Sequence, residues 1–258
     1  MIRRLAVALA VALAVGSCGG TPAPETLTVA VASSLEQAMT EAGAAFERLD
    51  DRTQLVITSG SSAALRTQIE QGAPFDVFLS ADTSNPQALA DGGFAAGAPV
   101  PFAATTLVLV VPIGNPGRVA GPADLARPGV RLVTAADPVP LAEYAAEEIR
   151  RLAAQTSDPE AFESALGANI VSREENAAAV LARVELGEAD AAFVYATDAA
   201  RSARVTTIPI PEAANVRVVY AGVVVAGRPL AGLGTDFLAW LAGDGGRTAL
   251  RPYGFLAP

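Results

Sequence analysis

Residues 68–82 read Gln68-Ile69-Glu70-Gln71-Gly72-Ala73-Pro74-Phe75-Asp76-Val77-Phe78-Leu79-Ser80-Ala81-Asp82, and they contain one unit of the fold. Ile69 belongs to a helical pattern that also includes Leu65. Phe75 to Leu79 is a short apolar run that predicts a strand, and the strand ends at Ser80-Ala81-Asp82. A helix that leads into a short buried strand is typical of the crossover connections found in parallel sheets.

The same alternation extends toward the N-terminus. Residues 27–32 form a valine-rich strand, which leads through Ser33-Ser34 into a helix with apolar residues from Leu35 to Phe46 on one face. Residues 55–57 form the next strand and enter the helix through the segment 58–62. Because strands that alternate with helices need crossover connections, we expect an α/β fold with mostly parallel sheets.

A second block repeats this pattern after residue 105. Two α/β blocks predict two lobes, and the apolar runs at 105–112 and 217–226 are expected to cross between them. We assign residues 27–104 together with 222–258 to lobe I, and residues 105–221 to lobe II. Strands are predicted at 107–111, 130–133, 169–171, 191–194 and 218–225, and helices at about 141–153, through Val180 and Val184, and over 235–250.

The N-terminal segment has the layout of a secretory signal. A basic start precedes an uncharged apolar run, which ends in small residues directly before Cys18. This arrangement resembles a bacterial lipoprotein signal, in which the cysteine is lipid-modified and becomes the new N-terminus. We therefore expect removal of residues 1–17, a flexible tether over 18–26, and an extracytoplasmic protein anchored to the membrane through lipid on Cys18. A plain signal peptide is the alternative.

The chain is acidic and lacks several reactive side chains. Its formal net charge is −9, its basic residues are all arginine, and it has no histidine. Nucleic acid and anionic membrane surfaces are therefore poor partners, and any anion site must be built from local dipoles. The composition excludes Ser-His-Asp triads, Ser-Lys dyads, Schiff bases and histidine zinc sites. Cys18, the one thiol, has no partner for an intramolecular disulfide. We expect no transmembrane helix after the signal.

Paired carboxylates remain as an enzymatic arrangement. Glu174-Glu175 is the obvious pair, and it would support a carboxylate-dependent hydrolase. Neighbours in sequence usually point apart, however, and acids beside a helix start are typical of a solvated helix N-terminus. We therefore expect no enzyme. An adhesion role, which the anchor alone would support, leaves the polar groups at the predicted strand ends unexplained.

Four predicted strand ends carry groups that suit an anion. Ser33-Ser34 and Ser61-Ser62 place hydroxyls at helix starts, while Pro140-Leu141 and Asn176-Ala177 place backbone N–H groups at two others. In open α/β sheets, ligands bind beyond the carboxyl ends of the strands, and helix starts accept anions readily. From these residues alone, the simpler account of each serine is an N-cap, and that of Tyr195 is a core or rim residue.

Several motifs carry a resemblance to a known family. The segment 68–82 is the most specific, and the likeness runs from about Leu27 to Phe255. The other motifs, in matching order, are Val31-Ala32-Ser33-Ser34-Leu35, Gly60-Ser61-Ser62, Asp137-Pro138-Val139-Pro140, Glu175-Asn176, Val194-Tyr195 and Tyr253-Gly254-Phe255. Together they resemble the periplasmic molybdate-binding protein family, the substrate-binding proteins of molybdate ABC transporters.

The resemblance implies a two-lobed type II periplasmic-binding-protein fold, with each lobe a mostly parallel sheet flanked by helices and the ligand in the cleft between them. It implies a monomer that binds molybdate and tungstate with high affinity, uses no cofactor, and delivers the oxyanion to a membrane permease. Neutral donors would hold the oxyanion through its oxygens, with no direct metal ligand. These donors would be the hydroxyl and N–H of Ser34 and Ser62, the N–H of Leu141 and Ala177, and the Tyr195 hydroxyl.

The chain departs from the family pattern at two of these positions. Leu141 stands where the family commonly has the alanine of Val-Pro-Ala-Gly, in a shortened loop, and Ala177 stands where valine is usual. Neither change removes a backbone donor, but Leu141 could alter the pocket and leaves another tetrahedral oxyanion, such as sulfate, as the alternative ligand. A ferric-ion receptor would need several tyrosines or carboxylates around the metal, and only Tyr195 lies at a predicted strand end.

Overall fold

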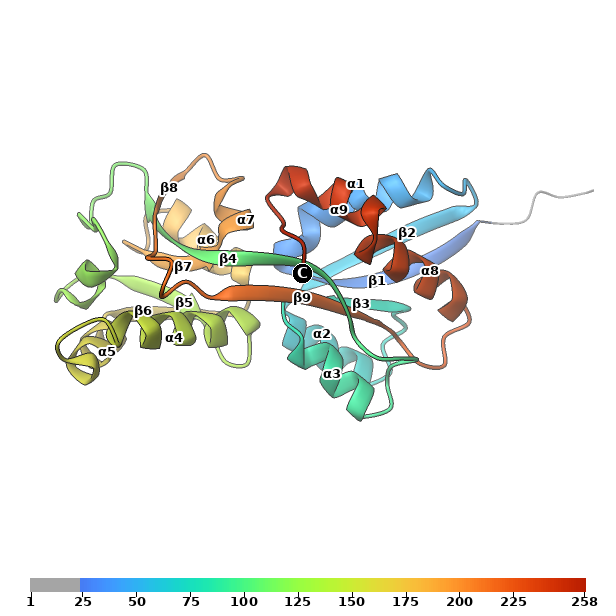
Figure 1. Cartoon of the computed structure of the whole chain (residues 1–258), viewed down its shortest axis with the longest axis horizontal. Helices are drawn as coiled ribbons and strands as arrows, with labels where there is room; N and C mark the ends of the chain where they lie inside the picture. Colours follow the sequence, from blue (N-terminus) through green and yellow to red (C-terminus); the bar gives the residue numbers. More distant parts are fainter. Residues whose placement is uncertain (1–23) are drawn as a thin grey trace, which may run out of the picture.

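The structure, a computed structural model, describes residues 24–258, and its elements form two groups joined by two long strands (Figure 1). In the first group, β1 pairs in parallel with both β2 and β3, and helices pack on both faces of the sheet. The elements are β1 (Glu25–Ala32), η1 (Ser33–Leu35), α1 (Glu36–Glu47), β2 (Thr53–Gly60), α2 (Ser62–Glu70), β3 (Val77–Ser80), α3 (Ser84–Asp91), α8 (Ala231–Ala242), α9 (Asp244–Leu250) and η3 (Arg251–Tyr253).

The second group contains a parallel pair, β5 and β6, and the strands β7 and β8. A bridge between Leu132 and Ala191 connects the parallel pair to the segment that enters β7. The elements are η2 (Pro122–Ala126), β5 (Leu132–Ala135), α4 (Pro140–Ala153), α5 (Pro159–Ala168), β6 (Ile170–Glu174), α6 (Ala177–Glu185), β7 (Ala192–Tyr195), α7 (Ala196–Ala199) and β8 (Val205–Ile208).

Two antiparallel strands, β4 (Val100–Pro112) and β9 (Arg217–Val224), run side by side from one group to the other (Figure 1). The first part of β4 pairs with β9, and from Leu107 onward it pairs with β7 and β8. β9 in turn pairs with β3, which gives the strand order β2-β1-β3-β9-β4-β7. The two groups therefore share a mixed sheet.

The fold confirms the predicted α/β class, and its parallel pairs are the ones that crossover helices connect. The prediction of mostly parallel sheets is corrected, because β4 and β9 run antiparallel to each other and to the strands they pair with. β1 begins at Glu25, so it takes in the last two residues of the predicted tether. β4 begins at Val100, five residues before the predicted crossing segment. Its pairing with β9 shifts register between Pro101 and Ala103, and a strand tolerates proline at such an irregularity. The predicted signal and Cys18 lie outside the described residues.

The core is one large apolar cluster that continues from the first group into the second, with a smaller cluster under α2 and α3. The predicted C-terminal helix is divided into α8 and α9 at Gly243, where the backbone is extended. Among residues 24–258, no helix combines the length and the apolar character that crossing a bilayer requires.

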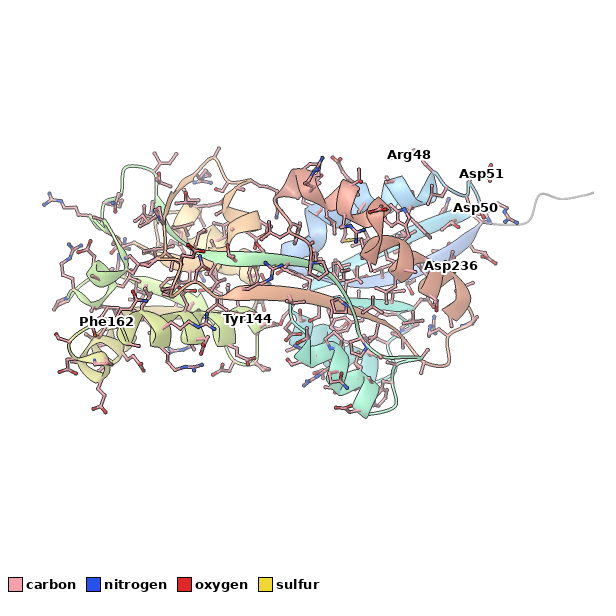
Figure 2. All side chains as sticks on the ribbon, viewed as in Figure 1. Arg48, Asp50, Asp51, Tyr144, Phe162 and Asp236 are labelled. Atoms are coloured by element: carbon pink, nitrogen blue, oxygen red, sulfur yellow. The ribbon has the colours of Figure 1, made fainter. Side chains whose placement is uncertain are left out.

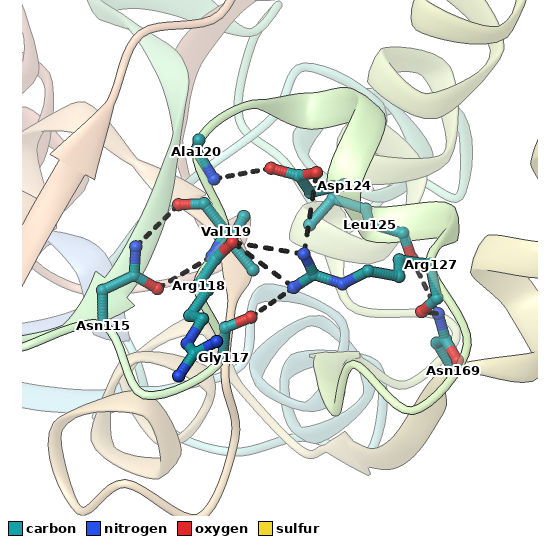
Figure 3. A network of polar contacts seen from close by, with 9 residues as sticks. All are labelled: Asn115, Gly117, Arg118, Val119, Ala120, Asp124, Leu125, Arg127 and Asn169. Carbon is teal, nitrogen blue, oxygen red and sulfur yellow. Dashed lines mark hydrogen bonds and ion pairs between the residues drawn. The ribbon is translucent and has the colours of Figure 1, made fainter.

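Charged side chains lie mainly on the outer surface. Arg48, Asp50 and Asp51 are at the far end of the first group, and Tyr144 on α4 lies near the junction of the two groups (Figure 2). At the other end, the loop between β4 and β5 is held by bonds from side chains to the backbone (Figure 3). The Asn115 amide pairs with both backbone groups of Val119, and Arg127 donates to neighbouring carbonyls.

Candidate anion site between the two groups

The register of the first sheet brings three strand ends together. Ala32 at the end of β1 is paired with Gly60 at the end of β2, so the serine pairs that follow these strands begin at the same edge. β3 lies on the other side of β1 and ends one residue before Ala81. Parallel pairing therefore explains why these segments, which are far apart in sequence, meet at one place.

The second group presents its own strand ends to this edge. β5 leads to Val139 and Pro140 at the start of α4, β6 leads to Ala177 at the start of α6, and β7 ends at Tyr195, which is paired with Leu107. One cavity is lined by Ser34, Ser62 and Ala81 from the first group and by Pro140, Ala177 and Tyr195 from the second. The volume open to the centre of a water-sized sphere is about 10 Å³, enough for one water molecule.

The lining of this cavity is uncharged and rich in hydrogen-bond donors. Helices α2, α4 and α6 begin at Ser62, Pro140 and Ala177, and the first N–H groups of a helix have no carbonyl partner within it. The Asn176 side chain takes the N–H of Ala179 at 2.9 Å, so the N–H of Ala177 is not consumed by this cap. Aligned peptide dipoles add partial positive charge at each start. The arrangement suits an anion without a cationic side chain.

The two serines are not N-caps. The helix starts at η1 and α2 have no side-chain capping bond. Instead, the Ser34 hydroxyl oxygen accepts from the Tyr220 hydroxyl at 3.2 Å, and the Ser62 hydroxyl oxygen accepts from the N–H of Ala81 at 3.2 Å. Each serine is almost fully buried. Each oxygen accepts one bond and keeps a second lone pair, and each hydroxyl hydrogen can be donated to an anion.

Tyr195 supplies a third hydroxyl. Its side chain is 1% exposed, and it lines the cavity. Burial is the main cause that raises the pKa of Tyr195 well above its ordinary value, and the negative charges of nearby acids act in the same direction. The phenol therefore keeps its proton at neutral pH and acts as a neutral donor.

Two buried acids lie near the cavity, and they differ in how fully their oxygens are bonded. Asp82 accepts bonds from the hydroxyls of Ser80 and Ser84 and from the backbone N–H and the side-chain amide of Asn85. Asp198 on α7 pairs with Arg201 at 2.9 Å. Burial raises the pKa of Asp198 to about 7, against the lowering effect of Arg201. Asp198 can therefore change its charge near neutral pH.

The structure brings together four of the five residues predicted to bind the anion, namely Ser34, Ser62, Ala177 and Tyr195. Leu141 is fully buried in the main apolar core, and its neighbours Val139 and Pro140 line the cavity instead. Its backbone N–H lies in the first turn of α4, so it is still among the unpaired donors of that helix start.

Two other sequence features lie away from the cavity. Glu174 ends β6, is buried, and pairs with Arg183 at 3.0 Å, while Glu175 is exposed. The solvated helix start expected for this pair therefore holds for Glu175 alone. The two carboxylates lie in different environments, which gives no support to a shared acid–base function. Within the described residues, no group of three or more carboxylates or thiols has the arrangement of a metal site.

Tyr220 and Ala81 are the contacts that sequence reasoning missed. Tyr220 is fully buried in the apolar strand β9, and Ala81 contributes only its backbone. A signal for Tyr220 did exist, since a buried tyrosine hydroxyl usually has a hydrogen-bond partner. The motif Tyr253-Gly254-Phe255 also reaches this region, because the Phe255 ring packs edge-on against Tyr220 at 5.3 Å.

Comparison with known proteins places this geometry in a family. Residues 27–256 match the model of the bacterial extracellular solute-binding proteins. The chain belongs to this family. The molybdate-binding protein ModA of Mycobacterium tuberculosis is 35% identical to this solute-binding protein over 241 residues, which cover 93% of the chain and 88% of ModA. This relative confirms the resemblance to molybdate-binding proteins. A putative ABC transporter substrate-binding lipoprotein of Bacillus subtilis is 28% identical and covers 90% of the chain and 86% of its own length.

Solved structures show the same fold. The periplasmic molybdate-binding protein of Azotobacter vinelandii has a TM-score of 0.76 at 23% identity, over 90% of this chain and 99% of the other. The sulfate-binding protein SubI of Mycobacterium tuberculosis also has a TM-score of 0.76, at 19% identity, over 89% of this chain and 86% of the other. The two-lobed periplasmic-binding-protein architecture predicted from sequence is therefore confirmed.

Proposed function

We propose that this solute-binding protein is a high-affinity receptor for molybdate and tungstate and delivers them to the permease of an ABC importer. The observation that carries the proposal is one uncharged cavity, built from both groups of elements and lined by hydroxyl and amide donors. A fully deprotonated oxyanion offers only acceptors, so a site rich in hydroxyl and amide donors matches it. Burial of a dianion among neutral dipoles is favourable only when its oxygens accept several hydrogen bonds.

The proposed ligands of the oxyanion are the hydroxyls and N–H groups of Ser34 and Ser62, the N–H groups of Leu141 and Ala177, and the Tyr195 hydroxyl. The lining of the cavity supports this choice of residues, and the binding proteins named above for molybdate support the choice of ion. We assign no catalytic role to the site. The ion would be held through its oxygens, so the metal itself needs no protein ligand.

Entry of the ion requires the two lobes to separate. The cavity has room for about one water molecule, which is less than a tetrahedral oxyanion with four oxygens needs. β4 and β9 pair in the sheet and connect the two lobes, so they are the natural place for a hinge. We therefore propose lobe I as residues 27–104 with 222–258 and lobe II as residues 105–221, closing around the ion.

Titration calorimetry of the purified protein against molybdate, tungstate, sulfate and phosphate tests the function. Saturable binding of molybdate and tungstate, with sulfate at least a hundredfold weaker, is the expected result. A folded protein that gives no heat with either metalate overturns the proposal. Sulfate is the second candidate because the sulfate-binding SubI shares the fold to the same TM-score. Preference for sulfate would identify this alternative. The metal–oxygen bonds of molybdate and tungstate are longer than the sulfur–oxygen bonds of sulfate, so selection between these ions depends on cavity size.

We also propose that Cys18 carries lipid and anchors a monomeric protein outside the cytoplasm. The sequence before Cys18 supports this, as does the relative from Bacillus subtilis that is named a lipoprotein. In a bacterial host, the wild type is expected in the membrane fraction and Cys18→Ala in the soluble fraction. Mass spectrometry of the mature N-terminus checks the acylation directly, and a membrane-bound Cys18→Ala variant would contradict it. Size-exclusion chromatography with light scattering checks the monomer.

A further inference from the structure

The motif Tyr253-Gly254-Phe255 carries the end of the chain against α7, which belongs to the second group of elements (Figure 1). Gly254 has a φ of 83°, in the left-handed region that glycine adopts without strain. On either side of this turn, the two rings have different neighbours. Phe255 packs edge-on against Tyr220, whereas the Tyr253 ring lies under the guanidinium of Arg201. The motif therefore contacts the second group outside the cavity lining.

Helix α7 links this contact to the cavity. Tyr195, which lines the cavity, is the N-cap residue of α7, so the helix starts directly behind it. Arg201 follows the other end of the helix, and its Nη2 donates to the Asp198 carboxylate at 2.9 Å. The guanidinium is thus held from its own helix. A short rigid segment connects a cavity residue with a cation that faces the other group.

The contact itself is a cation over an aromatic face. The guanidinium carbon of Arg201 lies 5.8 Å from the centre of the Tyr253 ring, within the range of about 6 Å over which such pairs attract. The Arg201 side chain is 21% exposed, so water screens its charge only in part. Desolvation, followed by the neighbouring Glu41 on α1, raises the pKa of Tyr253, so the ring is a neutral phenol at neutral pH.

We propose that Arg201 and Tyr253 are positioning residues that form a latch between the two lobes and slow the release of the bound ion. The proposal rests on the receptor function and the lobe division proposed above. Tyr253 belongs to lobe I and Arg201 to lobe II, so the latch breaks when the lobes separate. A cavity with room for about one water molecule cannot release a tetrahedral oxyanion without this separation. Opening therefore has to overcome the latch.

Tyr253→Leu tests the latch, because leucine removes the aromatic face and leaves the pair of Asp198 and Arg201 intact. Release is followed with radiolabelled molybdate chased by excess unlabelled molybdate. The pH is 8.5, above the pKa of about 7 of Asp198, so that its charge stays constant. We expect release to become about two to ten times faster. Association should stay within about twofold of the wild-type rate, since the latch forms only after the ion has entered.

Two further variants show whether the aromatic face is what matters. Tyr253→Phe keeps the ring and removes only its hydroxyl, so it should retain slow release. Phe94→Leu makes the same kind of change at a partly exposed ring on lobe I that does not line the cavity, and it should leave release unchanged. Fast release from Tyr253→Phe would overturn the assignment to the ring face.

A double-mutant cycle separates the latch from a structural role. In an Arg201→Gln background, Tyr253→Leu should have little further effect on the release rate, because the cation is already absent. A purely structural role of Tyr253 would instead lower the melting temperature of the ligand-free protein in both backgrounds and leave release unchanged.

Equal release from the wild type and Tyr253→Leu, or independent effects of the two substitutions, would overturn the latch while leaving the receptor function intact. A wild-type protein that binds no metalate would overturn the receptor function instead. The latch is then decided by the same cycle read as ligand-free melting temperatures, in which coupling of the two substitutions supports the contact and additive losses overturn it.

Discussion

Removal of the Ser62 hydroxyl gives a direct measure of what the cavity contributes. Ser62→Ala deletes a group that accepts from the N–H of Ala81 at 3.2 Å and whose hydrogen is available to the ligand. The hydroxyl makes no capping bond at the start of α2, and alanine is a good helix former, so the helix itself should persist. The expected effects therefore come from two hydrogen bonds.

The two bonds give separate magnitudes. A hydrogen bond to a charged oxygen contributes about 1.5–3 kcal/mol, so the dissociation constant for molybdate should rise by about tenfold to a hundredfold. The N–H of Ala81 loses its acceptor at a residue that is 3% exposed, which costs about 1–3 kcal/mol of unfolding free energy. The better helix propensity of alanine offsets a few tenths of this.

Calorimetric titration gives the first number, and urea unfolding monitored by circular dichroism gives the second. Ser164→Ala on α5 is the matched control, because Ser164 is exposed on the second group of elements and does not line the cavity. The control should change neither quantity by more than about 0.5 kcal/mol. An unchanged affinity in Ser62→Ala, in a folded protein that binds molybdate, would refute the assignment of Ser62 to the site.

Three further predictions follow from the buried polar groups. Tyr195→Phe should weaken molybdate binding about tenfold or more with little change in stability, since phenylalanine keeps the buried ring; calorimetry and a thermal melt check both. Molybdate affinity should rise as the pH falls from about 8 to about 6, because Asp198, with a pKa of about 7, loses a charge that repels the dianion; Asp198→Asn should flatten this profile in titrations across the range. Glu148→Gln should stabilise the protein above about pH 7 by up to about 3 kcal/mol, and not below pH 4.5. Burial raises the pKa of the fully buried Glu148 from 4.5 to about 7, so the wild type loses stability as the pH rises through this window, and glutamine still accepts from Val216; urea unfolding at several pH values checks the sign.

The sequence allowed prediction of those parts of the fold that depend on local pattern. Short apolar runs bounded by polar residues identified β1, β2 and β3, and parallel pairing then required their ends to meet. The same reasoning brought Ser34 and Ser62 to one edge. The family resemblance, rather than the pattern, distinguished these serines from ordinary N-caps.

The missed features depend on contacts between distant segments. Nothing local to Tyr220 indicates that its hydroxyl meets Ser34, which is 186 residues away in sequence. The side chain of Leu141 was expected to alter the pocket, but it lies in the apolar core. Its direction is set by the face of α4 that packs inward, and not by its position in sequence beside the cavity. The start of β4 was not predicted, because it contains Pro101 and proline normally argues against a central strand. The register shift that accommodates this proline is seen only once the two strands are paired.

An acidic protein can hold an anion here because charge is balanced locally rather than over the whole surface. The net charge of −9 gives no long-range attraction, and Asp82 and Asp198 lie close to the cavity. Asp82 is saturated by four donors, whereas Asp198 is paired with Arg201 through one oxygen only and has a pKa raised to about 7, so its charge is partly neutralised near neutral pH. What the ligand meets is a set of hydroxyls and helix starts whose dipoles are already oriented. Because these groups are fixed by the sheet register and by buried hydrogen bonds, selectivity follows from the number, direction and spacing of donors, and a change in any one of them should alter which oxyanion binds as well as how tightly.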